Sequence, residues 1–170
     1  MIAAIRSQFD LAWALTDLHL SALQDEDFLW EPARRCWTVR PDGSGRWRAD
    51  FAEVEPDPVP VPTIGWLTWH IVYWWSGALA SLSGDTPRRP TEVMWAGTGP
   101  AAVSQVRGLA GQWRELLADM ASSRLAESST FPWGTTDPRT VADTALWVTV
   151  ELTKNAAEIG QLRLLRAARV

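Results

Sequence analysis

Residues 103–120 have the sequence VSQVRGLAGQWRELLADM, and the spacing of their apolar side chains decides the fold class. These side chains recur in alternating steps of three and four residues, at Val103, Val106, Ala110, Trp113, Leu117 and Met120. Such spacing is typical of the seam of an antiparallel helical bundle. We therefore predict a helix from about Ala101 to Leu125 that packs against neighbouring helices.

Three further segments have the apolar periodicity of a helix. The first covers about residues 2–23 and carries two adjoining rows, which are Ile5, Phe9 and Ala12, and Leu11, Leu15, Leu18 and Ala22. The second begins at Thr63, a plausible N-cap, and ends before Gly84. The last opens at Asp137-Pro138, with the aspartate as N-cap, and continues to about Ala168.

The segments between these helices contain turn and proline signals. Residues 37–40 and 46–48 flank a Gly-rich turn and predict one short hairpin in the irregular stretch 28–62. Prolines at every second position from 56 to 62 exclude a helix there and indicate an extended connector. With no other convincing strand pair, the chain is predicted to be all-α: a four-helix bundle forming one domain over residues 1–170.

Composition limits the function classes. The 170 residues carry a net charge of −4, which argues against a nucleic-acid binder and against a partner of anionic membranes. No apolar stretch is long enough for a membrane span, and the N-terminus lacks the pattern of a signal peptide. Cys36 is the only cysteine, so an intramolecular disulfide and a Cys-based zinc site are excluded. We expect a cytoplasmic protein.

Tryptophan is strongly over-represented, with twelve residues against one tyrosine and four phenylalanines. One interpretation is that these large side chains simply fill the core. The other is an aromatic-walled pocket for a small organic ligand, with Trp66, Trp74 and Trp147 as candidate walls.

A helical wheel of the last helix places polar groups among its apolar residues. With Val148 at zero, Asn155, Glu151 and Glu158 fall at roughly 340°, 300° and 280°, inside the apolar arc. Lys154 falls at the edge of the arc, where its stem can pack while its amine reaches solvent. On the second helix, His70 lies on the inward side, whereas His19 on the first helix is peripheral.

Two interpretations of this polar cluster remain open. In the first, His70, Glu151, Asn155 and Glu158 bond to one another, to tryptophan N–H groups or to Lys154, and so specify the packing of the helices. In the second, His70 and Glu158, with Glu151, ligate a divalent metal that keeps an open position for water. The pattern alone is weak, because no two histidines occur at a helical spacing.

Short motifs along most of the chain resemble the DinB/YfiT-like superfamily. Residues 62–71, PTIGWLTWHI, resemble the start of its second helix, where a histidine follows a Gly–x–Leu–x–x–His run. Residues 158–162, EIGQL, resemble the end of its fourth-helix motif, His–x–x–x–His–Arg–Gly–Gln. Residues 28–32 and 36–40 are similar to the first loop of actinobacterial members.

The resemblance implies an up-down-down-up bundle that is often a homodimer. It also implies a divalent metal such as zinc or nickel, held by one histidine from the second helix and two from the fourth. Related enzymes are thiol-dependent S-transferases and isomerases, some of which use mycothiol or bacillithiol. In this sequence the second-helix histidine corresponds to His70, but Glu158 and Lys154 stand at the two fourth-helix positions.

This departure leaves two functional hypotheses. A lysine amine is normally protonated and repels a metal cation, so either Glu151 or Asn155 replaces the missing ligand, or the metal is lost and Lys154 pairs with Glu158. The first hypothesis is a metal-dependent S-transferase or hydrolase that acts on a small thiol conjugate. The alternative is a metal-free bundle that binds a small ligand or dimerises, with Val72 and Leu79 as candidate interface residues.

Overall fold

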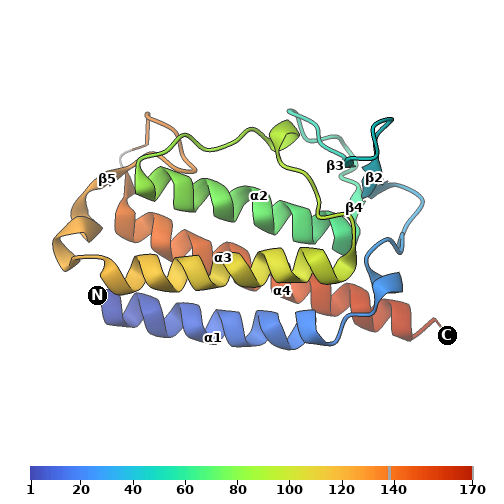
Figure 1. Ribbon diagram of the computed structural model, residues 1–170, viewed down its shortest axis with the longest axis horizontal. Helices are drawn as coiled ribbons and strands as arrows, with labels where there is room; N and C mark the ends of the chain where they lie inside the picture. The colour runs from blue at the N-terminus through green and yellow to red at the C-terminus, as the bar shows by residue number, and fades with distance from the viewer. Residues whose placement is uncertain (138, 170) are drawn as a thin grey trace.

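The computed structural model of the chain describes residues 1–137 and 139–169. Within these residues four long helices lie side by side: α1 (Ile2–Ser21), α2 (Ile64–Ser83), α3 (Gly99–Asp119) and α4 (Val141–Ala167). In the view of Figure 1, α1 and α4 run from left to right, while α2 and α3 run from right to left. The most extensive contacts join α1 to α4 and α2 to α3. The predicted all-helical class with four long helices is confirmed.

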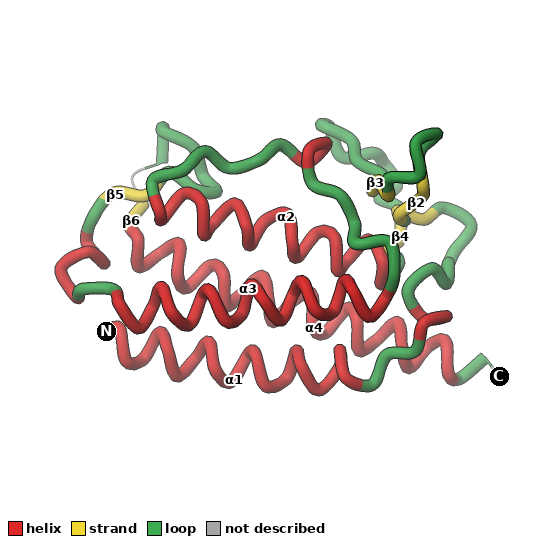
Figure 2. The backbone as a smooth tube through the Cα atoms, viewed as in Figure 1, coloured by secondary structure: helices red, strands yellow, loops and turns green. Residues whose placement is uncertain are grey.

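The remaining elements are short, and Figure 2 shows the strands at the two ends of the bundle. The strands are β1 (Cys36–Trp37), β2 (Val39–Pro41), β3 (Trp47–Ala49), β4 (Val61–Pro62), β5 (Ser128–Ser129) and β6 (Arg139–Thr140). Three single-turn 3₁₀ helices are η1 (Asp25–Asp27), η2 (Pro90–Glu92) and η3 (Ser122–Ala126).

The strands form three separate pairs among the described residues. The antiparallel pair of β2 with β3 is the predicted hairpin, which is thereby confirmed. The parallel pair of β1 with β4 and the antiparallel pair of β5 with β6 were not expected, so the prediction of a single pair is wrong. Strands of two residues are too short to show a periodic pattern, and the partners of these two pairs lie far apart in the chain.

Helix α2 has the boundaries that its sequence predicts. The hydroxyl oxygen of Thr63 accepts a hydrogen bond from the backbone N–H of Trp66, which is the expected N-cap. At the other end Gly84 adopts a left-handed conformation, and its N–H bonds to the carbonyls of Ala80 and Ser81. Glycine suits this position because it has no Cβ to clash there.

The predicted limits of α3 and α4 need correction. Helix α3 begins at Gly99 and ends at Asp119, six residues before Leu125, since Met120 adopts an extended conformation. The Arg6 guanidinium donates to the free carbonyls of Leu117 and Ala118 at this end. Helix α4 begins at Val141, and its N-cap is Thr140 rather than Asp137.

The start of α4 is set by a reciprocal pair of bonds. The Thr140 hydroxyl accepts from the N–H of Asp143, whose carboxylate in turn accepts from the N–H of Thr140. Pro138, predicted as the first helical residue, lies outside the described residues.

One apolar row of α1 does not face the core. Ile5, Phe9 and Ala12 are buried as expected, but Leu11, Leu15 and Leu18 are exposed. Their row lies about 120° around the helix from the buried one, so the two rows do not face the same core. Conversely Val72 and Leu79 on α2, the proposed interface residues, are buried, and that prediction is wrong. Helix α2 is buried over most of its surface, since segments on several sides pack against it.

Candidate functional site: a pocket between α2, α4 and the loop before α2

A cavity of about 400 Å³ opens between α2, α4 and the chain that precedes α2. Helix α2 contributes Trp66, Trp69, His70 and Tyr73 to its lining, and α4 contributes Lys154, Asn155 and Glu158. Trp37 and the segment 51–62 close the remaining side. The volume is in the range of pockets that hold small molecules. This is the candidate functional site.

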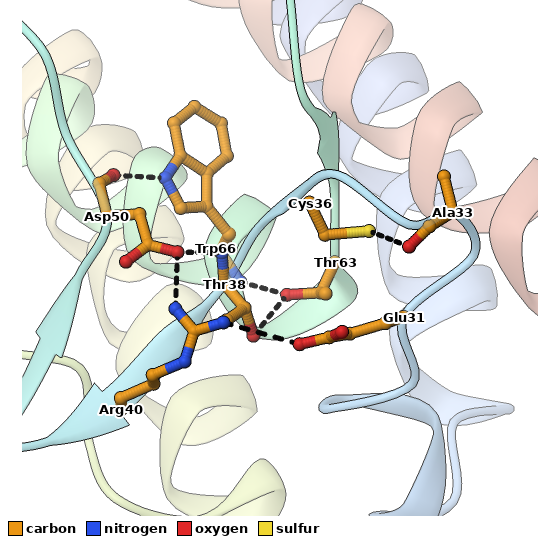
Figure 3. Close-up of polar contacts among 8 residues, drawn as sticks. All are labelled: Glu31, Ala33, Cys36, Thr38, Arg40, Asp50, Thr63 and Trp66. Atoms are coloured by element: carbon orange, nitrogen blue, oxygen red, sulfur yellow. Dashed lines mark hydrogen bonds and ion pairs between the residues drawn. The ribbon is translucent and has the colours of Figure 1, made fainter.

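Trp66 is positioned by a network of polar contacts at the start of α2 (Figure 3). Its indole N–H donates to the backbone carbonyl of Asp50 at 2.7 Å. The Asp50 carboxylate accepts from the N–H of Thr38 at 2.9 Å and from the Arg40 guanidinium at 2.7 Å. Thr38 also bonds through its hydroxyl to Thr63, the N-cap of α2. The network therefore ties the loop that carries Asp50 to the helix that carries the pocket.

An aromatic stack forms one wall of the cavity. The ring of Trp66 lies between Trp37 and His70, with centroid separations of 4.9 and 4.8 Å and planes inclined by 18° and 13°. Further along α2, Trp69 stacks on Tyr73 at 5.7 Å. Stacked aromatic pairs add to the stabilisation that burial alone provides. The wall is therefore held in shape by its own contacts.

His70 sits in this wall as a neutral imidazole. The pKa of His70 is lowered to about 4, chiefly by burial and in smaller part by the Lys154 ammonium, while Glu151 and Asn155 act in the opposite direction. Its Nδ1 is buried and has no hydrogen-bond partner among the described residues. At neutral pH the ring therefore brings no positive charge to the pocket.

On the opposite wall, Asn155 links α4 to α2. Its Oδ1 accepts from the indole N–H of Trp74 at 3.0 Å, and its Nδ2 donates to a Glu158 carboxylate oxygen at 2.8 Å. Asn155 is buried, so both its acceptor and its donor group are used inside the protein. The Glu158 carboxylate is consequently held toward the cavity that both residues line.

Lys154 is paired with Glu151, one helical turn away. Its Nζ lies 2.9 Å from a Glu151 carboxylate oxygen, and its side chain is about half exposed. The ion pair with Glu158 that the sequence suggested as one alternative does not form, because Glu158 bonds to Asn155 instead. Lys154 thus lines the pocket with a half-exposed side chain, as its place at the edge of the apolar arc predicts.

The structure brings together five of the eight residues selected from the sequence. His70, Lys154, Asn155, Glu158 and Trp66 all line the cavity, whereas Glu151, Trp74 and Trp147 do not. Trp147 packs edge-to-face on Trp74, Phe131 and Trp133, in a separate aromatic cluster. Trp74 contacts the site through its bond to Asn155, and Glu151 through its ion pair with Lys154 and its charge near His70.

His19 lies outside the pocket, at the seam between α1 and α4. A Cβ added at Gly160 would come within 2.6–2.9 Å of three atoms of the His19 ring. Gly160 therefore lets the imidazole approach the α4 backbone, and this gives the glycine of the Glu158–Leu162 motif a packing role.

Sequence reasoning missed most of the residues that the segment before α2 contributes. Trp37, Phe51, Glu53 and Glu55 line the cavity but were not selected, and Tyr73 on α2 was missed as well. The proline-rich run was interpreted only as a connector. This run is stiff and lies directly before the helix that carries His70. These two features could have indicated that it lines a site on that helix.

The donor set of the pocket does not fit the three-ligand metal centre that the resemblance implies. Among residues 1–137 and 139–169, no three His, Cys, Asp or Glu side chains lie close enough to hold one ion together. The Glu151 carboxylate is bonded to Lys154, and the Lys154 ammonium lines the same cavity as His70 and Glu158. Pairing with Lys154 takes the Glu151 carboxylate out of the donor set, so His70 and Glu158 are left without a third ligand.

The bundle and its pocket between the second and fourth helices define a class of helical proteins that build sites from inward-facing side chains. The model of the DinB superfamily matches residues 8–159, which is most of the chain. The chain belongs to the DinB superfamily. A comparison with curated proteins finds no match to it. None of the helices in the described ranges is long and apolar enough to cross a bilayer.

Proposed function

We propose that this DinB-superfamily protein binds a small organic molecule in the pocket between α2 and α4, and that it does so without a metal. The observation that carries the proposal is the Lys154–Glu151 ion pair at a cavity that otherwise has the size and aromatic lining of a ligand site. The pair occupies the carboxylate that would have supplied a third ligand.

The polar groups of the cavity support a binding role. Glu158 and Asn155 present a carboxylate and an amide that are fixed by their own bonds. His70 adds a neutral ring nitrogen, and the stacked rings of Trp37 and Trp66 give a rigid apolar wall. A few fixed polar groups in a mostly apolar concave surface are what small-molecule sites require.

The metal-dependent S-transferase or hydrolase remains the alternative function. It needs a metal that His70 and Glu158 hold together with a third donor, and it needs a low-molecular-weight thiol as cosubstrate. It has less support, because Lys154 stands where the resemblance places a histidine ligand, and an ammonium nitrogen has no lone pair to offer a metal. Metal content distinguishes the two functions.

The direct test is ligand binding in the presence of a chelator. A set of small aromatic compounds is titrated while tryptophan fluorescence and the melting temperature are recorded, because native-state binding raises the melting temperature with concentration. We expect Ala52→Trp, which fills an exposed rim position of the pocket, to abolish the shifts, whereas Ala101→Trp on exposed α3 should retain them. Shifts that appear only after zinc or nickel is added would overturn the metal-free function.

A homodimer is a second element of the proposal, and exposed apolar residues on α1 and α4 favour it. Leu11, Leu15 and Leu18 form a row on α1, and Leu146, Val150 and Leu164 form a row on α4. Leu15 lies one turn before His19 and Leu164 one turn after Gly160, so both rows run beside the α1–α4 seam.

The surface that these rows share suits a second copy of the chain. The charged side chains of α1 point elsewhere: Asp10 and Asp17 pair with Arg114 and Arg107 on α3. Uncharged apolar surface is typical of the centre of homodimer interfaces. A symmetric contact between two such faces would bury both rows at once.

A further inference from the structure

The carboxylates around the pocket have no cationic partners. Glu53, Glu55 and Glu158 all line the cavity, and none of them forms an ion pair with another described residue. The one cationic side chain in the lining, Lys154, is neutralised by Glu151 at 2.9 Å. The lining therefore carries an excess of negative charge.

Glu158 is the most firmly placed of these acids. Its carboxylate oxygen accepts the Asn155 amide at 2.8 Å, and Asn155 is in turn bonded to Trp74. This hydrogen bond uses one acceptor position of the Glu158 carboxylate, and the remaining positions can accept hydrogen bonds from a ligand. Glu53 and Glu55 are exposed on the loop and lie at the rim.

Aromatic side chains accompany these acids. Trp66 is buried and stacks on both Trp37 and His70, so it offers a ligand little free surface. Trp37 and Tyr73, however, are only half-buried, and Phe51 is exposed, so these three rings keep surface that a ligand can contact. Aromatic faces attract cations through their quadrupole, and the attraction is strongest where water is excluded.

We propose that the ligand of this pocket is a small organic cation, an amine or quaternary ammonium on an apolar body, with its charge beside Glu158 and its body against Trp37, Phe51 and Tyr73. The proposal rests on the proposed function, since it names the ligand class of the same site. The neutral state of His70 is consistent with it, because the ring does not repel a cation at pH 7.

Four probes of similar size and different charge test the proposal. Benzyltrimethylammonium and benzylamine are cationic at pH 7.5, benzyl alcohol is neutral and benzoate is anionic. Dissociation constants are measured for each by calorimetry and by tryptophan fluorescence, in chelator-treated protein. We expect the two cations to bind about tenfold or more tighter than benzyl alcohol, and benzoate to bind most weakly. Added salt should weaken the binding of the two cations and leave the binding of benzyl alcohol unchanged.

A pair of variants tests whether the preference for cations comes from Glu158. Glu158→Gln keeps the side-chain length and an oxygen for the Asn155 amide but removes the charge, so it should lose the preference for cations over benzyl alcohol. Glu115→Gln, on an exposed part of α3 outside the pocket, should keep that preference. The circular dichroism spectrum and melting curve of each variant establish that it is folded.

The outcomes separate the two proposals. If benzyl alcohol or benzoate binds as tightly as the cations, or if Glu158→Gln keeps the preference, the ligand class is wrong while the pocket remains a binding site. If none of the four probes binds at millimolar concentration, the proposed function and the ligand class are both wrong.

Discussion

The indole Nε1 of Trp74 lies 3.0 Å from Oδ1 of Asn155, and this buried hydrogen bond joins α2 to α4 beside the pocket. We expect Asn155→Leu to lower the free energy of unfolding by about 1–3 kcal/mol, because it leaves the Trp74 N–H buried without an acceptor. Urea denaturation measures the change. Gln161→Ala, at an exposed position of the same helix, should stay within about 0.5 kcal/mol of the parent protein.

A double variant separates the bond from general packing. In Asn155→Leu/Trp74→Phe both hydrogen-bonding groups are gone, so the two single effects should not add. Strict additivity would show that the bond itself contributes nothing to stability.

Gly160 is predicted to be intolerant of a methyl group. A Cβ there meets the His19 ring within 3 Å, so Gly160→Ala should destabilise the protein by about 1–3 kcal/mol through overpacking. Gly108→Ala is the matched control: it is an exposed position inside α3 with open space around the new Cβ. It should stabilise by up to about 1 kcal/mol, because alanine is the better helix former. Thermal unfolding measures the stability of both variants. Adding His19→Ala to Gly160→Ala should restore part of the lost stability, because the ring that meets the new Cβ is then gone.

His70 makes stability depend on pH in a defined direction. Burial lowers its pKa from the ordinary value of 6.5 to about 4. Between these values the unfolded chain binds a proton that the native protein does not, so stability falls as the pH drops from about 6.5 to about 4. The loss amounts to up to about 3 kcal/mol.

Urea midpoints at several pH values, for the parent protein and for His70→Gln, measure this effect. Contributions from carboxylates are common to both proteins and cancel in the difference between them. The parent should lose more stability than the variant on acidification. An equal loss in both would show that His70 takes up its proton as readily in the native state as in the unfolded chain.

Metal binding should be weak and should respond to Lys154. After incubation with zinc or nickel and removal of the excess, we expect elemental analysis to find far less than one equivalent of metal. Lys154→His removes the ammonium and adds a ligand nitrogen one turn from Glu158, so it should raise metal retention, whereas Lys154→Gln should raise it much less. One full equivalent in the parent protein would contradict the metal-free function.

The dimer prediction concerns the apolar rows of α1 and α4. Light scattering behind size exclusion should give about twice the chain mass for the parent protein. Leu15→Glu/Val150→Glu places four charges in the symmetric contact and should give a monomer. Val54→Glu, at an exposed apolar position of the loop, should leave the mass unchanged. A monomeric parent at micromolar concentration would exclude this interface.

Several features of the fold could be predicted because they depend on residues close together in the chain. The N-cap at Thr63, the glycine stop at Gly84 and the hairpin of residues 39–49 are such local features. The helical wheel also placed His70, Asn155 and Glu158 on the sides of their helices that line the cavity. Periodicity carries this information because a buried face needs a repeating set of side chains.

Features that depend on which segments meet were predicted poorly. The Leu11 row looked as apolar as the Ile5 row, and only the positions of α3 and α4 decide which of them is buried. Val72 seemed exposed because its helix was expected to have a free side. The pairing of Lys154 with Glu151, and not with Glu158, likewise depends on Asn155 and Trp74 occupying the space beside Glu158.

By itself, then, the amino-acid sequence determined the helical class, the extent of α2 and the inward-facing polar residues, since all of these follow from short-range propensity and periodicity. The tertiary structure alone decided that the loop of residues 51–62 lines the same cavity as His70 and that Glu158 forms no ion pair there with a described residue. The physical reason is that a pocket and its charge balance are made by segments distant in the chain, and their meeting is set by the packing of the whole bundle.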